Sequence, residues 1–289
     1  MPAFSYTNKR RLVVKVGSSL LIGDDGHVHR HWLAGLAEDI AMLRTAGHEL
    51  IVVSSGAIAI GSTILGINKR RAKLEDLQAA AAAGQVQLVH AYQEALGVHR
   101  IIAAQVLLTP GDTEHRRRFL NARGTLARLL ERSVVPIINE NDTVATEEIR
   151  YGDNDRLAAR VSQLVMADAL ILLSDVDGLY STDPGENPTA LHIPEVAAIT
   201  EDIVRIAGAS RSDIGSGGMA TKVQAARIAT RAGCSTVVSY GAVERPLSAL
   251  AAAGRHTVFH AESSPSAARK QWLARANTAA SEIAIPTGA

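Results

Sequence analysis

Short runs of apolar, often β-branched residues alternate along the chain with longer segments in which apolar residues recur every three or four positions. Continuous apolar runs are typical of strands in a parallel sheet, because helices cover both faces of such a sheet. The predicted strands are residues 12–16, 50–54, 101–107, 134–138, 170–174, 236–239 and 257–259. Strands that alternate with helices indicate βαβ units. The pattern therefore predicts an α/β fold, a three-layer α/β/α sandwich with a mainly parallel central sheet.

Four segments have the pattern of helices. The first lies between the first two strands, where one apolar face is formed by Leu33, Leu36, Ile40 and Leu43. Gly47 follows this face and has the position of a helix C-cap. Residues 74–96 are rich in alanine and predict one long helix, or two helices joined near Gly84. Residues 155–167 and 219–232 complete the set, and each begins where a polar or glycine-rich motif ends.

Turn-forming residues cluster at 178–188, where Asp183 and Asn187 are each followed by a proline. Such pairs favour turns, so we place a soft boundary there between an N-terminal and a C-terminal portion. The composition changes again after residue 262. The tail, 263–289, predicts a helix near 268–276 and a strand-like segment at 282–285.

Composition narrows the class of protein. With 289 residues and 47% apolar content, the chain can bury the core of one large domain or two modest ones. Its 30 basic and 29 acidic residues nearly cancel, and only 3% of residues are aromatic. A nucleic-acid-binding protein needs a basic surface and, for single strands, aromatic stacking platforms. We therefore expect no nucleic-acid partner, and any anion site must be local.

Cysteine content and hydropathy predict the cellular location of the protein. Cys234 is the single cysteine, so an intramolecular disulfide is impossible and a reducing compartment fits. The first residues lack the apolar stretch of a secretory signal, and no run approaches the roughly 20 apolar residues of a membrane span. We expect a cytoplasmic protein that does not enter a membrane.

Two lysines lie beside flexible glycines in positions suited to phosphate binding. Lys15 ends the first predicted strand and precedes Gly17, while Lys222 follows a glycine-rich stretch at 215–218. Ligands of open α/β sheets bind at the carboxyl ends of strands, and helix N-termini favour anions. Phosphoryl transfer requires cations and close N–H donors. The two lysines are therefore predicted to converge on one phosphate chain, although ordinary strand-to-helix turns would give the same local pattern.

Acidic and amide side chains form two dense clusters, at residues 139–142 (NEND) and 152–155 (GDND). Buried carboxylates are costly without partners, so clusters that follow a strand favour a site. Asp142 could hold a substrate ammonium, Asn154 a carboxylate through its amide N–H, and Asp155 could position the two lysines. The alternative is an Asx-turn followed by a helix N-cap.

Hydroxyl groups follow two other strands. Ser55 lies in a Ser-Ser-Gly-Ala turn that offers N–H donors to a carboxylate or phosphate. Ser174 and Asp175 end the strand 170–174, and with nearby Tyr180 they could hold a ribose and an adenine. A strand-end turn would explain all of these residues except Tyr180.

Other motifs are excluded or weak. No Walker A sequence occurs, and the stretch Gly215 to Ala220 matches the dinucleotide fingerprint only formally, because no strand precedes it. His27, His29 and His31 alternate, but their neighbours are typical of a loop, so a metal site is the weaker interpretation.

Six segments, taken in order, carry a family resemblance: residues 13–19 (VVKVGSS), 53–59 (VSSGAIA), 138–145 (INENDTVA), 152–155 (GDND), 173–180 (LSDVDGLY) and 215–222 (GSGGMATK). Together they closely resemble the glutamate 5-kinase family of the amino-acid kinase superfamily. The resemblance extends from about residue 12 to residue 272, and the ordered set is far more specific than any single motif. It implies the amino-acid kinase fold.

The resemblance also implies roles, position by position. Lys15 and Lys222 would stabilise the transferring phosphoryl group, and Asp155 would organise them. Glutamate would be bound by Ser55, Asp142, Asn154 and Asp153. ATP would be bound by Lys15, Ser174, Asp175, Ser216, Gly217, Gly218, Met219, Ala220, Thr221 and Lys222.

The implied reaction is attack of the γ-carboxylate of L-glutamate on the γ-phosphate of ATP, which gives L-glutamyl 5-phosphate, the first step of proline biosynthesis. Mg²⁺ would arrive with ATP rather than at a protein metal site. Residues 1–262 would form the kinase domain, with glutamate bound by about 1–177 and ATP by about 178–262. The tail 263–289 resembles the start of a C-terminal PUA domain of the RNA-modification-enzyme type.

Expected partners beyond the substrates are proline as a feedback inhibitor, glutamyl phosphate reductase through functional coupling, and further copies of the chain in a homo-oligomer. Proline would act through the glutamate pocket or the nearby segment 112–118. Two alternatives stay open at this point. The chain could be a sister kinase of the acetylglutamate or aspartate type, or a nucleotide-binding sensor without catalytic activity.

Overall fold

The computed structural model describes residues 3–69, 71–144, 154–209 and 218–268. Its centre is an eight-stranded sheet in the order β3-β4-β2-β1-β5-β9-β10-β8. The strands are β1 (Arg11–Val16), β2 (Glu49–Ser54), β3 (Ala103–Leu108), β4 (Val135–Glu140), β5 (Ala169–Ser174), β8 (Glu195–Val196), β9 (Ser235–Tyr240) and β10 (His256–Phe259). The six strands from β3 to β9 are mutually parallel, and β10 pairs antiparallel with β9. The predicted, mainly parallel sheet is therefore confirmed.

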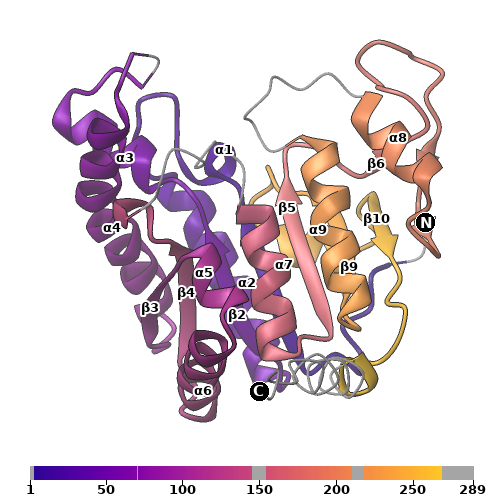
Figure 1. Cartoon of the computed structure of the whole chain (residues 1–289), viewed down its shortest axis with the longest axis horizontal. Helices are drawn as coiled ribbons and strands as arrows, with labels where there is room; N and C mark the ends of the chain where they lie inside the picture. Colours follow the sequence, from indigo (N-terminus) through magenta and orange to yellow (C-terminus); the bar gives the residue numbers. More distant parts are fainter. Residues whose placement is uncertain (1–2, 70, 145–153, 210–217, 269–289) are drawn as a thin grey trace, which may run out of the picture.

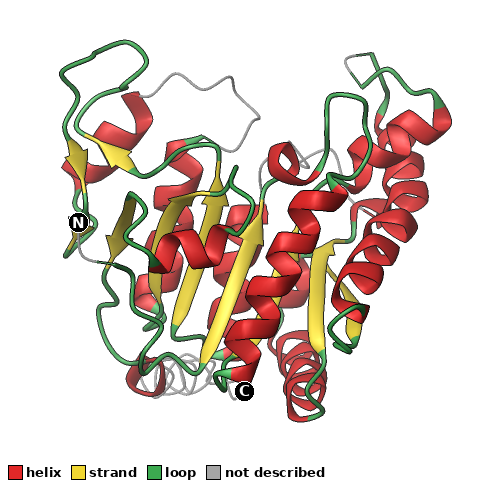
Figure 2. Cartoon of the chain, turned by 180° about the vertical axis from the view of Figure 1, so that it is seen from behind, coloured by secondary structure: helices red, strands yellow, loops and turns green. Residues whose placement is uncertain are grey.

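Helices cover both faces of this sheet, as Figures 1 and 2 show. One face packs against α1 (Ser18–Leu21), α2 (Arg30–Thr45), α3 (Ala57–Leu65), α4 (Leu74–Gly97) and α10 (Pro246–Ala251). The other packs against α6 (Arg116–Glu131), α7 (Asn154–Val165), α8 (Glu201–Ala209) and α9 (Met219–Arg231). Along β1, Leu12 and Val14 enter the first core and Val13 enters the second. This period of two explains why central strands are apolar throughout, and it confirms the three-layer sandwich.

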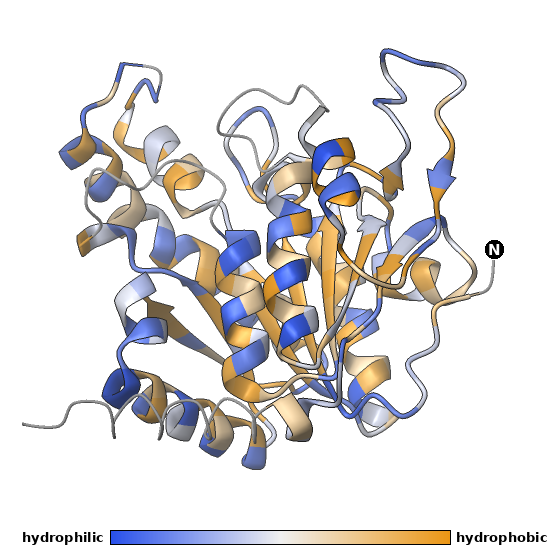
Figure 3. Ribbon diagram, turned by 45° about the vertical axis from the view of Figure 1, so that its right-hand side comes forward, coloured by the Kyte–Doolittle hydropathy of each residue, from blue (hydrophilic) through white to orange (hydrophobic). Residues whose placement is uncertain are grey.

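Hydropathy follows the layers. In Figure 3 the strands at the centre of the sheet are largely hydrophobic, whereas the helices in front of them carry hydrophilic residues on their outward faces. The predicted end of α2 is correct, because Gly47 has a φ of 94° just after the helix, and this left-handed conformation is easiest for glycine. No helix of the described segments is long and apolar enough to cross a lipid bilayer.

The alanine-rich segment forms one continuous helix, α4, so the alternative of two helices joined near Gly84 is wrong. Gly84 instead allows close packing between α4 and the neighbouring helix α3. A Cβ atom at Gly84 would lie 1.9 Å from the carbonyl oxygen of Ala57, and one at Gly61 would lie 1.7 Å from that of Ala80. The two glycines thus allow α3 and α4 to lie in direct backbone contact. This contact fixes the segment that follows β2 against α4.

Several elements do not follow from the hydrophobic pattern. The turn-rich segment contains a small antiparallel pair, β6 (Leu179–Tyr180) and β7 (His192–Ile193), followed by β8 and α8. The basic run at 116–118 begins α6, and its three arginine side chains are exposed. Short helices α5 (Pro110–Glu114) and η1 (Asp142–Val144) follow β3 and β4. The predicted tail helix and strand after residue 268 lie outside the described residues.

Candidate active site

Polar side chains gather where the parallel strands end. Lys15 lies near the end of β1, Ser55 follows β2, Asn139 is the second-last residue of β4, and Ser174 ends β5. Since β1, β2, β4 and β5 run parallel, their carboxyl ends share one edge of the sheet, which is the upper edge in Figure 1. Open α/β sheets bind ligands at this edge. The segments that carry the sequence motifs therefore meet at one place.

At the centre of this edge, two lysines contact one buried carboxylate. Lys15 Nζ lies 2.6 Å from Asp155 Oδ1, and Lys222 Nζ lies 3.4 Å from Asp155 Oδ2. Asp155 is fully buried, and Lys15 and Lys222 are only 8% and 5% exposed. The three residues come from β1, α7 and α9, so the fold brings the two predicted lysines and Asp155 together, whereas their contact with a phosphate chain stays a prediction. Thr221 adds a hydroxyl that donates to Asp155 Oδ2 over 3.3 Å.

The ionisation state of Asp155 is set by the two lysines that contact it. Burial alone would raise the pKa of Asp155, but the ammonium groups of Lys15 and Lys222 outweigh it, and the pKa is lowered. Asp155 is therefore ionised at neutral pH. One carboxylate between two cations leaves a net positive charge, which favours a phosphate chain.

A second group of polar side chains lies next to Asp155 in sequence. Asn154 Nδ2 donates to Ser55 Oγ over 2.7 Å, to Asn139 Oδ1 over 3.1 Å and to the Ser54 carbonyl over 3.4 Å. Asn139 Nδ2 in turn donates to Gln85 Oε1 on α4 over 2.8 Å. The sequence-based expectation gave the Asn154 N–H to a substrate carboxylate. In the structure that nitrogen faces three protein oxygens, and Asn154 Oδ1 is buried with no hydrogen-bond partner among the described residues.

Asp142 opens the short helix η1, which packs against α4. Burial raises the pKa of Asp142 to about 6. A carboxylate with such a pKa is ionised at neutral pH and uncharged in mild acid. Asp153, the remaining predicted glutamate ligand, lies outside the described residues.

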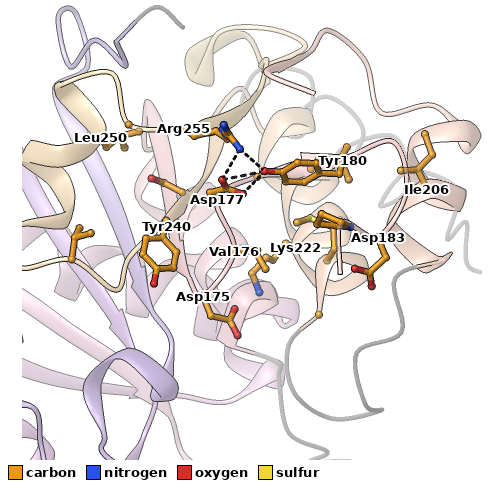
Figure 4. Close-up of a pocket in the computed structure, with 18 of the residues that line it drawn as sticks. Asp175, Val176, Asp177, Tyr180, Asp183, Ile206, Lys222, Tyr240, Leu250 and Arg255 are labelled. Atoms are coloured by element: carbon orange, nitrogen blue, oxygen red, sulfur yellow. Dashed lines mark hydrogen bonds and ion pairs between the residues drawn. The ribbon is translucent and has the colours of Figure 1, made fainter. Parts of the chain in front are cut away.

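On the other side of Lys222, the structure contains a cavity of about 610 Å³ (Figure 4). Four of the predicted ATP-binding residues line it: Asp175, Gly218, Met219 and Lys222. Ser174 donates to Asp175 over 2.9 Å and so contacts a lining residue. Ala220 and Thr221 are in the first turn of α9, whose N-cap is Gly218. Ser216 and Gly217 lie outside the described residues.

One wall of the cavity carries a hydrogen-bonded group that sequence reasoning mostly missed. The Tyr180 hydroxyl donates to Asp177 at 2.9 Å, and Arg255 donates to the Tyr180 oxygen over 3.0 Å (Figure 4). Tyr240 lies on another part of the wall. Tyr180 was expected near a nucleotide, but Arg255 is 75 residues away in sequence, and no local pattern connects the two.

Gln85 was also missed, although a signal exists. It lies four residues from Ala81 and from Val89, both buried, and is thus a polar residue on the apolar face of α4. A buried polar side chain on such a face needs a hydrogen-bonding role. Within the segments that the structure describes, no group of three or more His, Cys, Asp or Glu side chains is arranged to hold a metal ion.

Comparisons with known proteins agree with this geometry. A model of the amino acid kinase family matches residues 10–239. The chain is 53% identical over 281 residues to a glutamate 5-kinase of Rhodopseudomonas palustris (strain BisB5), covering 97% of this chain and 75% of that protein. It is 56% identical over 265 residues to a glutamate 5-kinase of Paramagnetospirillum magneticum, covering 91% and 71%.

Solved structures give the fold independently. The UMP kinase of Ureaplasma parvum superposes with a TM-score of 0.59 at 15% identity, over 88% of this chain and all of that one. An isopentenyl phosphate kinase superposes with a TM-score of 0.58 at 18% identity, over 86% and 99%. At such identities the likeness establishes the shared architecture alone.

Proposed function

The chain belongs to the amino acid kinase family and, within it, to the glutamate 5-kinases, and from this premise we propose how its residues work. The protein transfers the γ-phosphoryl group of ATP to the γ-carboxylate of L-glutamate and forms L-glutamyl 5-phosphate, the first step of proline biosynthesis. The observation that carries the proposal is the contact of Lys15 and Lys222 with the buried carboxylate of Asp155. This contact lies between the polar side chains around Asn154 and the cavity.

ATP occupies the cavity in this proposal. The lining residues run from Asp175 to Arg255, and Lys222 joins the cavity to the lysine cluster. Gly218 and the first turn of α9 offer backbone N–H groups to phosphate oxygens, with Lys15, Ser174, Asp175 and residues 216–222 as the nucleotide ligands. Mg²⁺ would arrive with the nucleotide and would offset the charge of its phosphate groups. The mixed, lysine-paired environment of Asp155 does not itself suit a cation.

Glutamate binds on the other side of the cluster, through Ser55, Asp142 and Asn154, with Asp153 in the same shell. The proposal is supported by their chemistry. Hydroxyl, carboxylate and amide groups together can pair with both the ammonium and the carboxylate of a free amino acid. The γ-carboxylate then points toward Lys15 and Lys222.

The chemical step needs positioning and charge stabilisation more than proton transfer. A carboxylate is already a nucleophile, so no general base is required. Negative charge spreads over the oxygens of the transferring phosphoryl group, and Lys15 and Lys222 stabilise that charge. Asp155 holds the two ammonium groups on either side of the transfer path.

The division of labour along the chain stays a proposal. Residues 1–262 form the kinase domain, with glutamate bound by about 1–177 and ATP by about 178–262, and the tail 263–289 resembles the start of a PUA domain. We also propose a cytoplasmic location, a homo-oligomeric state, feedback inhibition by proline through the glutamate pocket or residues 112–118, and functional coupling to glutamyl phosphate reductase.

Hydroxylamine trapping tests the function directly, because it converts acyl phosphates to hydroxamates. The purified chain is incubated with Mg-ATP and L-glutamate, N-acetylglutamate, L-aspartate or no acceptor. Hydroxamate with L-glutamate alone is expected. Signal with N-acetylglutamate or aspartate instead would move the assignment to a sister kinase, and ATP binding without any hydroxamate would favour a sensor.

A further inference from the structure

Four polar side chains from four separate segments form one continuous chain of hydrogen bonds behind the glutamate side of the site. It runs from Gln85 on α4 through Asn139 on β4 and Asn154 on α7 to Ser55 after β2. Gln85 is 8% exposed and Asn139 is 2% exposed. We call this set the amide relay. Its buried members have no access to bulk water that could replace a missing partner.

The direction of donation along the amide relay follows from one backbone group. A carbonyl oxygen can only accept, so the Asn154 atom that contacts the Ser54 carbonyl must be its NH₂ group. The Asn139 atom facing that NH₂ group must therefore be its oxygen, and the Asn139 NH₂ group then faces Gln85. The Gln85 atom that accepts from it must be Oε1. Every amide in the relay is thus held in one orientation.

This orientation leaves a particular acceptor for a ligand. With its NH₂ group directed at three protein oxygens, Asn154 presents Oδ1, which is buried and has no partner among the described residues. At the far end, Gln85 Nε2 is likewise buried with no partner in the described part of the chain. Buried polar atoms in this state are rare and costly, so a ligand or an ordered water is expected to satisfy them.

We propose that Gln85 is a positioning residue that makes the site select an amino acid over the same dicarboxylate without its amino group. The inference rests on the proposed function and deepens it. An ammonium group has three donors and no acceptor, and it would meet two acceptors, Asn154 Oδ1 and the Asp142 carboxylate. Glutarate, which lacks the ammonium, would leave Asn154 Oδ1 unsatisfied, and sites with unpaired polar groups discriminate strongly against such analogues.

Gln85 acts through Asn139 and needs no contact with substrate. Without the Oε1 acceptor, the buried Asn139 NH₂ group loses its partner, and the Asn139 amide is held at one end only, by the contact of its Oδ1 with Asn154. If Asn139 turned over, its NH₂ group would face the NH₂ group of Asn154, and Asn154 would have to turn as well. Asn154 would then offer donors to the substrate ammonium, which is the wrong polarity.

The test compares single variants by steady-state kinetics with L-glutamate and with glutarate. Gln85→Met keeps the length of the side chain and removes the acceptor, whereas Gln85→Glu keeps an acceptor oxygen. Gln93→Met is the matched control, because Gln93 is an exposed residue of the same helix. For Gln85→Met we expect the KM for L-glutamate to rise about tenfold with the KM for ATP unchanged within twofold.

The decisive quantity is the ratio of kcat/KM for L-glutamate to that for glutarate. We expect it to fall at least fivefold in Gln85→Met and to stay within twofold of wild type in Gln85→Glu and Gln93→Met. Asn139→Leu interrupts the amide relay one step later and must lower the same ratio, which keeps the test intact if Gln85→Met does not fold.

An unchanged ratio in Gln85→Met or Asn139→Leu, in a wild-type protein that does make glutamyl hydroxamate, would overturn this inference and leave the proposed function standing. Loss of thermal stability with the ratio unchanged would show a merely structural role and would also overturn it. Wild-type protein that makes no glutamyl hydroxamate would refute the proposed function, and the inference with it.

Discussion

Asp39 and Asp155 are both completely buried carboxylates, but their surroundings differ. Asp39, on α2, accepts hydrogen bonds from the backbone N–H groups of Leu247 at 2.8 Å and Ser248 at 3.1 Å, from the Ser248 hydroxyl, and from Arg245 at 3.1 Å. It therefore caps α10 and ties it to α2. Asp155 pairs instead with the ammonium groups of two long side chains.

The difference separates a buried charge that ties two helices together from one that we propose to act in catalysis. The partners of Asp39 lie within four consecutive residues at the start of one helix, and two of them are backbone groups that cannot move away. The partners of Asp155 come from separate elements at the ligand-binding edge, and one of them lines the cavity. Burial is equal at the two sites, so the chemistry and the origin of the partners carry the distinction.

The largest effect is expected from Asp155→Asn. Neutralising this carboxylate removes the group that aligns Lys15 and Lys222, so we expect kcat to fall about 10³-fold, which corresponds to about 4 kcal/mol of transition-state stabilisation. The measurement is kcat for glutamyl hydroxamate formation in protein whose circular dichroism matches wild type. Activity within tenfold of wild type would place Asp155 beside Asp39 as a structural residue.

Asp39→Asn should act on folding instead. The amide would point an NH₂ group at N–H donors that now have a carboxylate, and Arg245 would lose its buried partner, so we expect the free energy of unfolding to fall by about 3 kcal/mol. Urea denaturation measures this loss. The folded variant should keep kcat within threefold of wild type, and a larger loss of kcat would contradict the comparison.

Lys222→Ala sharpens the comparison within the active site. In the proposed mechanism this ammonium stabilises charge that develops on the phosphoryl group, so we expect kcat to fall roughly 10²-fold, with the KM for ATP changed much less. Arg205→Ala is a suitable control, because Arg205 is an exposed cation of α8, paired with Asp202 at 2.6 Å. Turnover of Lys222→Ala within threefold of wild type would remove Lys222 from the mechanism.

The comparison of Asp39 with Asp155 also explains which parts of the fold and of the candidate site could be predicted from the sequence. Strands such as β1, β2 and β5 are buried on both faces, so their apolar runs identify them, and the motifs at their ends single out Lys15, Ser55 and Ser174 as candidate site residues. Asp155 also follows from its motif. Asp39 does not, because it is one acidic residue within an amphipathic helix, and its cap is made by residues more than 200 positions away.

Elements in the second half of the chain were harder to predict for a related reason. β6, β7 and β8 are two residues long, and pairing with distant partners rather than local hydrophobic pattern makes them strands.

Gly84, in the first half of the chain, was ambiguous because a glycine within a helix can mark either a break or a close contact. Only the position of the Ala57 carbonyl, on another helix, decides between them.

Asp142 gives the smallest and most specific prediction, because its charge changes within an accessible pH range. Its pKa, raised to about 6 by burial, means that its ionised fraction rises from roughly one tenth at pH 5 to nine tenths at pH 7. Only the ionised form attracts the substrate ammonium. We therefore expect kcat/KM for L-glutamate to rise about ninefold over this range, and Asp142→Asn to abolish the rise and increase the KM for glutamate.

Stability should respond to the same titration in the opposite direction. Because the folded protein holds this proton more tightly than the unfolded chain, the stability contributed by protonated Asp142 is present below its ordinary pKa and is lost as the pH rises through about 6. Between pH 5 and 7 the unliganded protein should thus lose a little stability while glutamate binds better. Asp155, with its lowered pKa, stays ionised and contributes to neither trend, so a kcat/KM profile for glutamate that is flat from pH 5 to 7 would exclude Asp142 as the ammonium ligand.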